Sequence, residues 1–550
     1  MSQRANTRSR AGCLTCRQRH VRCDEQRPSC QACLAGNRSC NYAAPVIPLR
    51  DRRMLQKNAL PPGQQAPWAL AKADGMTGRK RAPGSAMDPF DILPIKMPFK
   101  SQELYHYFYH TGAAFAVAPA DPKDDCIALA THDEHALRST LLLAGIHYCW
   151  NTGNLQDYES AFLFHKVESI RIVNSWLGAA GSKTFLACVR QILTISLSEA
   201  CLGNLAAAET HLNGVMALFD SHGQAAGACD KVDDIDSELA SRYLLLTSCF
   251  VLALKSRLED FTLFRAAQGI DPNDDGSSSE ALHLMKMWHK IEYRGLETRL
   301  KAIRLFPYFF SPPPIHGKRP KSVDAMPIID CLKKMTEAAD LVCTNPTPQN
   351  INRVWNDGGP TKLLLILVTS HISSFSNDDK DQVSATGGKP SQPLLQSSWS
   401  GISAAVELYM HSVLNIVNAG EPLESRLLYR ILLILKRDIE QTRADLGGTH
   451  GSLRQSLWFW KAFLGALALS NHMAIDTRAS TPDKWSCEAD LDDLYEWFRD
   501  CVRAWSAVTG TTDWSVVRSR LAMFAWPAAL SCDGKGFGED IWAQMKKTYG

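Results

Sequence analysis

Six cysteines that fall within a stretch of 28 residues constrain this chain of 550 residues more than any other feature. They form two copies of a C-x2-C-x6-C pattern separated by six residues: Cys13, Cys16, Cys23, Cys30, Cys33 and Cys40. The first eight residues, MSQRANTR, contain no apolar segment of the kind found in secretory signals. We therefore expect a reducing intracellular environment, in which a disulfide framework is rare.

Metal binding accounts for this cysteine pattern. A C-x2-C pair lets two thiolates bind one metal from a tight turn, and zinc takes four ligands in a tetrahedron. Two zinc ions need eight ligand positions, so six thiolates suffice only if two of them bridge both ions. His20 is the only histidine in this window, and its position in the repeat does not supply the missing zinc ligands. A single-zinc site with two spare cysteines remains an alternative, as does a disulfide pair or a reactive thiol cluster.

The spacing and its surroundings resemble the fungal zinc binuclear cluster transcription factors. The matching residues are RSRAGCLTCRQRHVRCDE (8–25), RPSC (27–30) and CNY (40–42). Pro28 matches the proline that this family places in the loop between the two halves. The resemblance implies two Zn²⁺ ions bridged by Cys13 and Cys30, one completed by Cys16 and Cys23 and the other by Cys33 and Cys40.

The first half of the cluster is the more basic half, and we predict that it contacts double-stranded DNA. The resemblance implies that the helix after Cys16 enters the major groove, where Arg19 and His20 approach the bases of a CGG-type triplet. An arginine can bind guanine O6 and N7 with two hydrogen bonds. Many family members have lysine at the position of His20. The predicted DNA contacts are Arg8, Arg10, Arg17, Gln18, Arg19, His20 and Arg22, with Arg8, Arg10, Arg17 and Arg22 assigned to phosphates.

The distribution of charge supports a nucleic-acid partner. The formal net charge is only +3, but the first hundred residues carry +12 and the remaining 450 carry −9. A basic N-terminal region on an acidic body is typical of nucleic-acid binders. Residues 1–53 contain a single aromatic residue, Tyr42, which disfavours recognition of single strands by base stacking.

The sequence predicts four segments. Residues 1–10 form a flexible basic arm, residues 11–42 the zinc cluster, residues 43–100 a linker with nine prolines, and residues 101–550 an all-helical body. Basic patches at 50–53 and 78–83 are candidates for nuclear import, with a solvated linker as the alternative. The linker contains no run of apolar heptads, so either the protein binds DNA as a monomer or the body forms a homodimer.

Helical periodicity dominates the body. Leu163, Val167, Ile170, Val173 and Leu177 recur every three or four residues and predict one apolar face of a helix. Further helical segments are predicted at 205–219, 402–417, 427–439, 457–469 and 494–508, and a break is predicted at Gly203-Asn204. The longest apolar stretch, 243–254, is shorter than the ~20 residues that span a bilayer, so we expect no membrane partner. The fold class is therefore mainly α.

Three parts of the body carry a second, more diffuse match: LYHYF (104–108), the stretch 199–212, and a Trp-rich end with WFW (458–460), Trp514 and Trp526. In these parts the body resembles the fungal-specific regulatory domain that accompanies such clusters. The resemblance implies an α-helical domain of regulatory or effector-sensing function, and the acidic charge of the body predicts contact with coactivators or corepressors. We predict no enzyme and no catalytic residues, because Gly178–Thr184 lacks the glycine before the lysine of a phosphate loop and His132–His135 is expected to begin a helix. The alternative function is a zinc-stabilised scaffold that binds proteins without reading bases.

Overall fold

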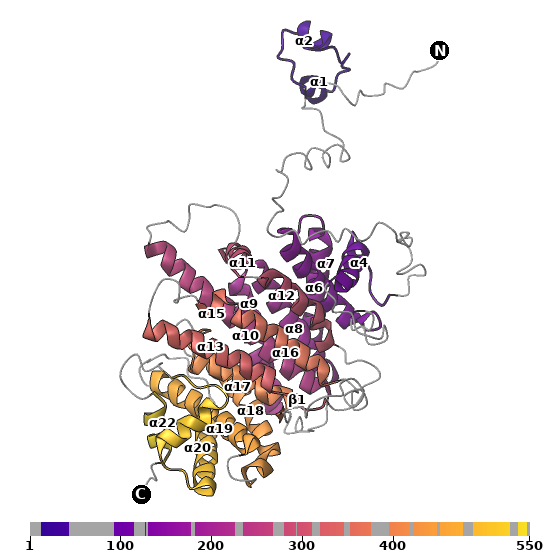
Figure 1. Ribbon diagram of the computed structural model, residues 1–550. Helices are drawn as coiled ribbons and strands as arrows, with labels where there is room; N and C mark the ends of the chain where they lie inside the picture. The colour runs from indigo at the N-terminus through magenta and orange to yellow at the C-terminus, as the bar shows by residue number, and fades with distance from the viewer. Residues whose placement is uncertain are drawn as a thin grey trace, which may run out of the picture. The chain divides into compact units, whose positions relative to one another are not determined.

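The chain divides into two units, Met1–Ala66 and Pro67–Gly550, in the computed structural model (Figure 1). The predicted arm with Arg8 and Arg10, and both basic patches of the linker, lie outside the described residues. The described residues are 13–42, 93–114, 127, 130–177, 182–225, 235–267, 280–292, 294–310, 320–345, 353–375, 395–417, 423–447, 452–476, 488–528 and 537–546.

The first unit contains two short helices, each of which begins directly after a cysteine. Helix α1 spans Leu14–Gln18 and helix α2 spans Gln31–Leu34. Cys13 and Cys30 are the N-caps of these helices, and both have an extended backbone, with ψ of 153° and 152°. The two halves of the sequence repeat therefore have the same local structure.

The second unit is a body of packed helices, and this confirms the predicted mainly α fold. In Figure 1, α4, α6 and α7 lie at one end of this body and α19, α20 and α22 at the other. The helices are α4 (Ser101–Ala114), α6 (Glu134–Thr152), α7 (Glu159–Leu177), α8 (Ser182–Leu202), α9 (Leu205–Ala225), α10 (Ile235–Ala267), α11 (Glu280–Ile291), α12 (Gly295–Leu305), α13 (Met326–Thr344), α15 (Arg353–Asn356), α16 (Gly359–Ser373), α17 (Trp399–Ser412), α18 (Ser425–Gln441), α19 (Leu453–Asp476), α20 (Glu488–Thr509), α21 (Trp514–Ala522) and α22 (Phe537–Lys546), with 3₁₀ turns η2 (Phe306–Phe309) and η4 (Arg443–Gly447).

Helix α10 connects the two ends of the body. It packs against α8 and α9 on one side and against α17 on the other, and α17 in turn contacts α18 and α19. Extended structure in the described residues is limited to β1 (Val323–Asp324) and β2 (Gln396–Ser397), which pair antiparallel with Val323 opposite Ser397. The body is thus held together by helix packing.

Local sequence signals account for several helix boundaries. Asp133 caps α6 by accepting a hydrogen bond from the backbone N–H of Ala136 at 2.6 Å, so the charged segment at 132–135 begins a helix as expected. Gly203 has a φ of 97°, a left-handed conformation that favours glycine, and it separates α8 from α9 at the predicted break. Ser398 caps α17 in the same way as Asp133 caps α6.

The apolar face predicted for α7 is partly wrong. The helix exists, but the side chains of Leu163, Val167 and Leu177 are 46%, 45% and 55% exposed. Val173 of the predicted set is buried, together with Phe162 and His165. An ideal Cβ on Gly145 of α6 would lie 2.4 Å from the Phe162 ring. The missing side chain at Gly145 therefore leaves room for Phe162 to pack against α6.

Two helical stretches, 184–202 in α8 and 235–260 in α10, are long and apolar enough to cross a membrane by composition alone. The structure places 78% and 61% of their most apolar windows inside the body. An apolar surface on all sides is typical of a helix in the core of a large helical domain. These two stretches therefore have a structural role in the body.

Candidate metal centre and nucleic-acid interface

The cysteine sulfurs of the first unit converge in its centre. Five of the six cysteines are buried, and Cys40 is half-buried. The sulfurs form two groups of four, and within each group the atoms lie within 4.8 Å of one another. Two cysteines belong to both groups. The groups are Cys13, Cys16, Cys23 and Cys30, and Cys13, Cys30, Cys33 and Cys40.

The distances between sulfurs fit zinc coordination. Cys13 Sγ lies 3.7 Å from Cys30 Sγ and 3.7 Å from Cys33 Sγ, and Cys16 Sγ lies 3.5 Å from Cys30 Sγ. A Zn–S bond of ~2.3 Å gives a tetrahedral edge of about 3.8 Å, whereas a disulfide requires about 2.05 Å. The described cysteines form no disulfide. The donor set therefore fits the chemistry of zinc.

Backbone N–H groups point at the sulfurs. Cys13 N lies 3.4 Å from Cys23 Sγ, Cys16 N lies 3.3 Å from Cys13 Sγ, and Cys30 N lies 3.3 Å from Cys40 Sγ. Six thiolates with two Zn²⁺ ions carry a net charge of −2, and these donors stabilise the excess negative charge. Such hydrogen bonds around the ligands orient and tune a metal site.

Polar contacts hold the two halves of the cluster together. Leu14 N donates to the carbonyl of Asn41 at 2.7 Å, and Thr15 Oγ1 donates to the carbonyl of Ser39 at 2.8 Å. Both contacts join α1 to the last residues of the cluster, so the folding of one half depends on the other. The sequence alone does not indicate the role of Thr15.

Asp24 and Tyr42 support the loop between the halves. Both carboxylate oxygens of Asp24 accept from the N–H of Gln31, the first residue of α2, at 3.2 Å. Tyr42 donates from its hydroxyl to the carbonyl of Gln26 at 2.8 Å, and its ring lies under the guanidinium of Arg27 at 4.9 Å. Desolvation and the neighbouring Cys23 sulfur raise the pKa of the Tyr42 phenol, so the hydroxyl stays protonated.

The basic residues after Cys16 form an exposed edge of the first unit. Arg17, Gln18, Arg19, His20 and Arg22 are all exposed. Within the described part of the chain, none of the three arginines forms an ion pair. Their charges are therefore available to an anionic partner.

The prediction that the first helix follows Cys16 and carries Arg17, Arg19, His20 and Arg22 is partly wrong, because α1 begins at Leu14 and contains Cys16. The helix ends at Gln18, Arg19 is its C-cap, and His20 has a φ of 57°, in the left-handed region. His20 and Arg22 therefore lie beyond the helix and not on it. The helix ends early because the chain must turn back toward the cluster, where Cys23 is buried.

Comparison with protein-family models matches residues 11–46 to the fungal Zn(2)-Cys(6) binuclear cluster domain. The N-terminal domain is a fungal zinc binuclear cluster. The resemblance on which the sequence analysis relied is confirmed for this domain, and its cofactor is zinc, two ions per cluster.

The curated relatives match the chain over short stretches of 34 to 66 residues. "Adhesion and hyphal regulator 1" of Candida albicans is 56% identical over 34 residues, which is 6% of this chain and 5% of that protein. "Transcription factor lfc1" of Flammulina velutipes is 46% identical over 54 residues, 10% of this chain and 19% of that protein. "Aspercryptin biosynthesis cluster-specific transcription regulator atnN" of Emericella nidulans is 41% identical over 66 residues, 12% and 9% of the two chains.

The matched stretches therefore cover less than a fifth of these relatives. No solved structure matches the chain. The relatives that are named as transcription factors belong to a non-enzymatic class, which agrees with the expectation that this chain is not an enzyme.

Proposed function

We propose that this chain is a zinc-dependent, sequence-specific DNA-binding regulator of RNA polymerase II transcription that acts in the nucleus. The observation that carries the proposal is the exposed basic edge at residues 17–22, held on a compact cluster of six cysteines. A rigid basic surface of this kind binds phosphates and positions a few side chains at the bases. The names of the matched relatives give further support.

In this proposal the DNA contacts have two roles. Arg19 and His20 approach the bases of a CGG-type triplet in the major groove, with the guanidinium of Arg19 on a guanine. Arg17 and Arg22 bind phosphates beside Gln18, and Arg8 and Arg10 extend the phosphate contacts from the arm. His20 has a left-handed backbone conformation just after α1. In this proposal its side chain therefore approaches the bases from the turn and not from the helix.

The zinc ligands are proposed from the two groups of sulfurs. Cys13 and Cys30 belong to both groups, so they are proposed to bridge the two ions. The remaining ligands are proposed as Cys16 and Cys23 on one ion and Cys33 and Cys40 on the other. A cluster of this kind couples metal binding to folding, which makes DNA binding dependent on zinc.

The proposal is tested by selection of bound duplexes from a random pool with the full-length, zinc-loaded protein. The wild type is expected to enrich a CGG-type triplet, and Arg19→Ala is expected to relax the preference at one guanine. Arg38→Ala is the matched control, because Arg38 is an exposed arginine in the less basic half. An unselective profile from the wild type would contradict base readout and favour the protein-binding scaffold.

The helical body is proposed as the regulatory domain, spanning 101–550. It contains the acidic part of the chain, with a formal charge of −9 over residues 101–550, and acidic surfaces can contact coactivators or corepressors. It is also the proposed site of homodimerisation, if the protein dimerises. A second half-site at a fixed spacing in the selected duplexes would support dimerisation, whereas isolated triplets would support a monomer.

A further inference from the structure

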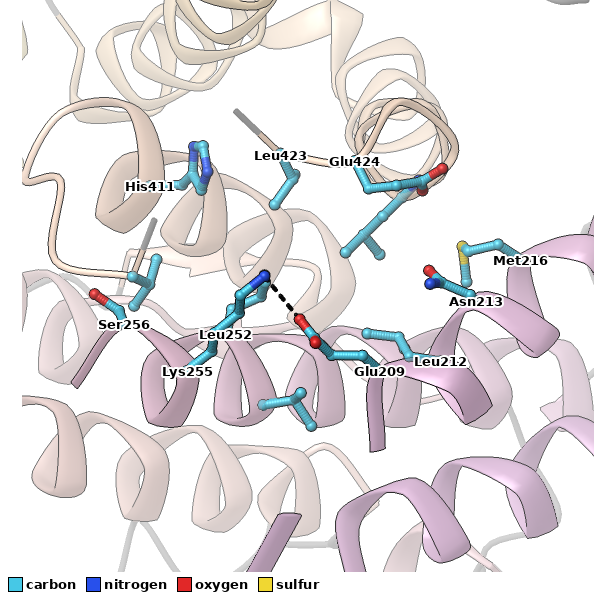
Figure 2. A pocket seen from close by; sticks show the side chains of 13 residues that line it. Glu209, Leu212, Asn213, Met216, Leu252, Lys255, Ser256, His411, Leu423 and Glu424 are labelled. Carbon is cyan, nitrogen blue, oxygen red and sulfur yellow. Dashed lines mark hydrogen bonds and ion pairs between the residues drawn. The ribbon is translucent and has the colours of Figure 1, made fainter. Parts of the chain in front are cut away.

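Helices α9, α10, α17 and α18 line a partly open cavity of about 330 Å³ in the body (Figure 2). Protein interiors are normally close-packed, with few voids larger than a water molecule. A cavity of about 150 Å³ holds a benzene molecule, so this one has room for a molecule of about two fused rings. Small-molecule sites in proteins begin at about this volume.

Seven of the thirteen side chains that line the cavity are apolar, and the other six are Glu209, Asn213, Lys255, Ser256, His411 and Glu424. Leu212 and Met216 of α9, Val251 of α10 and Leu427 of α18 line it, and each is at most 5% exposed. Side chains that are buried in this way hold the shape of the cavity. An apolar molecule would therefore meet a preformed surface.

The polar side chains that line the cavity include one ion pair. Lys255 of α10 and Glu209 of α9 point toward one another in Figure 2, with Lys255 Nζ 2.9 Å from a Glu209 carboxylate oxygen. Both side chains remain about one-third exposed, at 31% and 36%. The pair therefore offers a hydrogen-bond donor and an acceptor side by side, and each can be shared with a bound molecule.

Each of the two carboxylates that line the cavity already has a cationic partner. Glu209 is paired with Lys255, and the second acidic residue, Glu424, binds Arg426 at 2.9 Å and caps α18 through the N–H of Leu427. A ligand with a net charge would bring an unmatched charge into a partly apolar site, which is costly. The charge balance therefore selects a neutral ligand.

We propose that this cavity binds a neutral, mainly apolar molecule of about two fused rings, whose single polar end is held by Lys255 and Glu209. Such a ligand would contact α9 and α18. These two helices are also joined by an ion pair between Asp220 and Arg430, whose charged atoms lie 3.4 Å apart. Binding would link these two helices further and raise the thermal stability of the body, because a ligand that binds only the folded state stabilises it.

The probe for the test is prodan, a neutral fluorescent naphthalene with one carbonyl acceptor, titrated into the full-length, zinc-loaded protein. We expect saturable binding to one site, with a blue-shifted emission and a higher melting temperature. The anionic naphthalene dye 8-anilinonaphthalene-1-sulfonate is expected to bind at least tenfold more weakly. Non-saturable prodan binding, or equal affinity for the anionic dye, would overturn the proposal.

Two matched variants locate the site. Asn213 and Ala217 lie one turn apart on α9 and both are exposed, but only Asn213 lines the cavity. Asn213→Trp is expected to weaken prodan binding at least tenfold, whereas Ala217→Trp is expected to change it less than twofold. Lys255→Met, which removes the donor of the polar pair, is expected to weaken it several-fold. Unchanged affinity in both Asn213→Trp and Lys255→Met would place the dye elsewhere and refute the proposal.

Discussion

Glu407 of α17 predicts an unusual pH dependence for the stability of the body. Its side chain is buried, at 2% exposure. One carboxyl oxygen accepts a hydrogen bond from Ser248 Oγ at 2.7 Å, and the other has no hydrogen-bond partner within the described part of the chain. Desolvation raises the pKa of this carboxyl to about 8. We therefore expect Glu407 to be protonated in the folded protein at neutral pH.

The sign and size of the effect follow from proton linkage. The pKa of Glu407 is higher in the folded state than its ordinary value of 4.5, so between these two values the folded state holds one more proton than the unfolded state. The contribution of this proton to the free energy of unfolding is fully present below pH 4.5 and is lost as the pH rises toward 8. Each pH unit lowers the free energy of unfolding by about 1.4 kcal/mol. Between pH 5 and pH 8 the loss is roughly 4 kcal/mol.

Glu407→Gln isolates this contribution, because glutamine keeps an acceptor for Ser248 and cannot ionise. The free energy of unfolding is measured by urea denaturation of the full chain, followed by the fluorescence of its tryptophans, all of which lie after residue 67. The two proteins are expected to be similar at pH 5, and the variant is expected to be more stable at pH 8.

Buried histidines also titrate, but their effect is common to both proteins. Burial lowers the pKa of His147 and His165 to about 3, so each reduces stability as the pH falls below about 6.5. The difference between wild type and variant removes this contribution. Parallel pH profiles for the two proteins would refute the reasoning, because they would show that Glu407 is ionised in the folded state.

Three further predictions concern the metal centre, the core and the DNA interface. Cys30→Ala is expected to lose both zinc ions in native mass spectrometry of the full chain, whereas Cys40→Ala retains at least one; equal loss from both would contradict the bridging role. Lys461→Met leaves Asp438 without the buried cation that lies 2.6 Å away and is expected to lower the free energy of unfolding by about 3–5 kcal/mol. A loss below about 1 kcal/mol in urea denaturation would contradict a stabilising buried ion pair at this position. Arg17→Ala is expected to reduce the slope of log affinity against log salt by about 0.9, and an unchanged slope would remove Arg17 from the phosphate contacts.

The metal centre was predictable because its information is local. The two C-x2-C-x6-C repeats place all six thiols within 28 residues, independently of the helical body. The start of α1 directly after Cys13 was not predicted. The helices of the body were predictable for a similar reason, since a period of three or four residues specifies a helix without its neighbours. The break at Gly203 also lies in the sequence itself.

Contacts between distant residues could not be predicted in this way. The packing of α7 against α6 depends on the space at Gly145, and the environment of Glu407 depends on Ser248, which lies 159 residues earlier. The early end of α1 at Gln18 depends on the turn back to Cys23. The cavity beside Lys255 likewise forms only when four separate helices pack together.

The most direct test of the account is the ratio of affinities for two duplexes that differ at one base pair. Fluorescence anisotropy with the full-length, zinc-loaded protein at physiological salt would compare a CGG-containing duplex with one in which a single guanine of the triplet is replaced. The account predicts a loss of about 1–3 kcal/mol, which is roughly 5- to 150-fold in affinity, and a smaller ratio for Arg19→Ala. Equal affinity of the wild type for both duplexes would contradict sequence-specific DNA recognition by this protein.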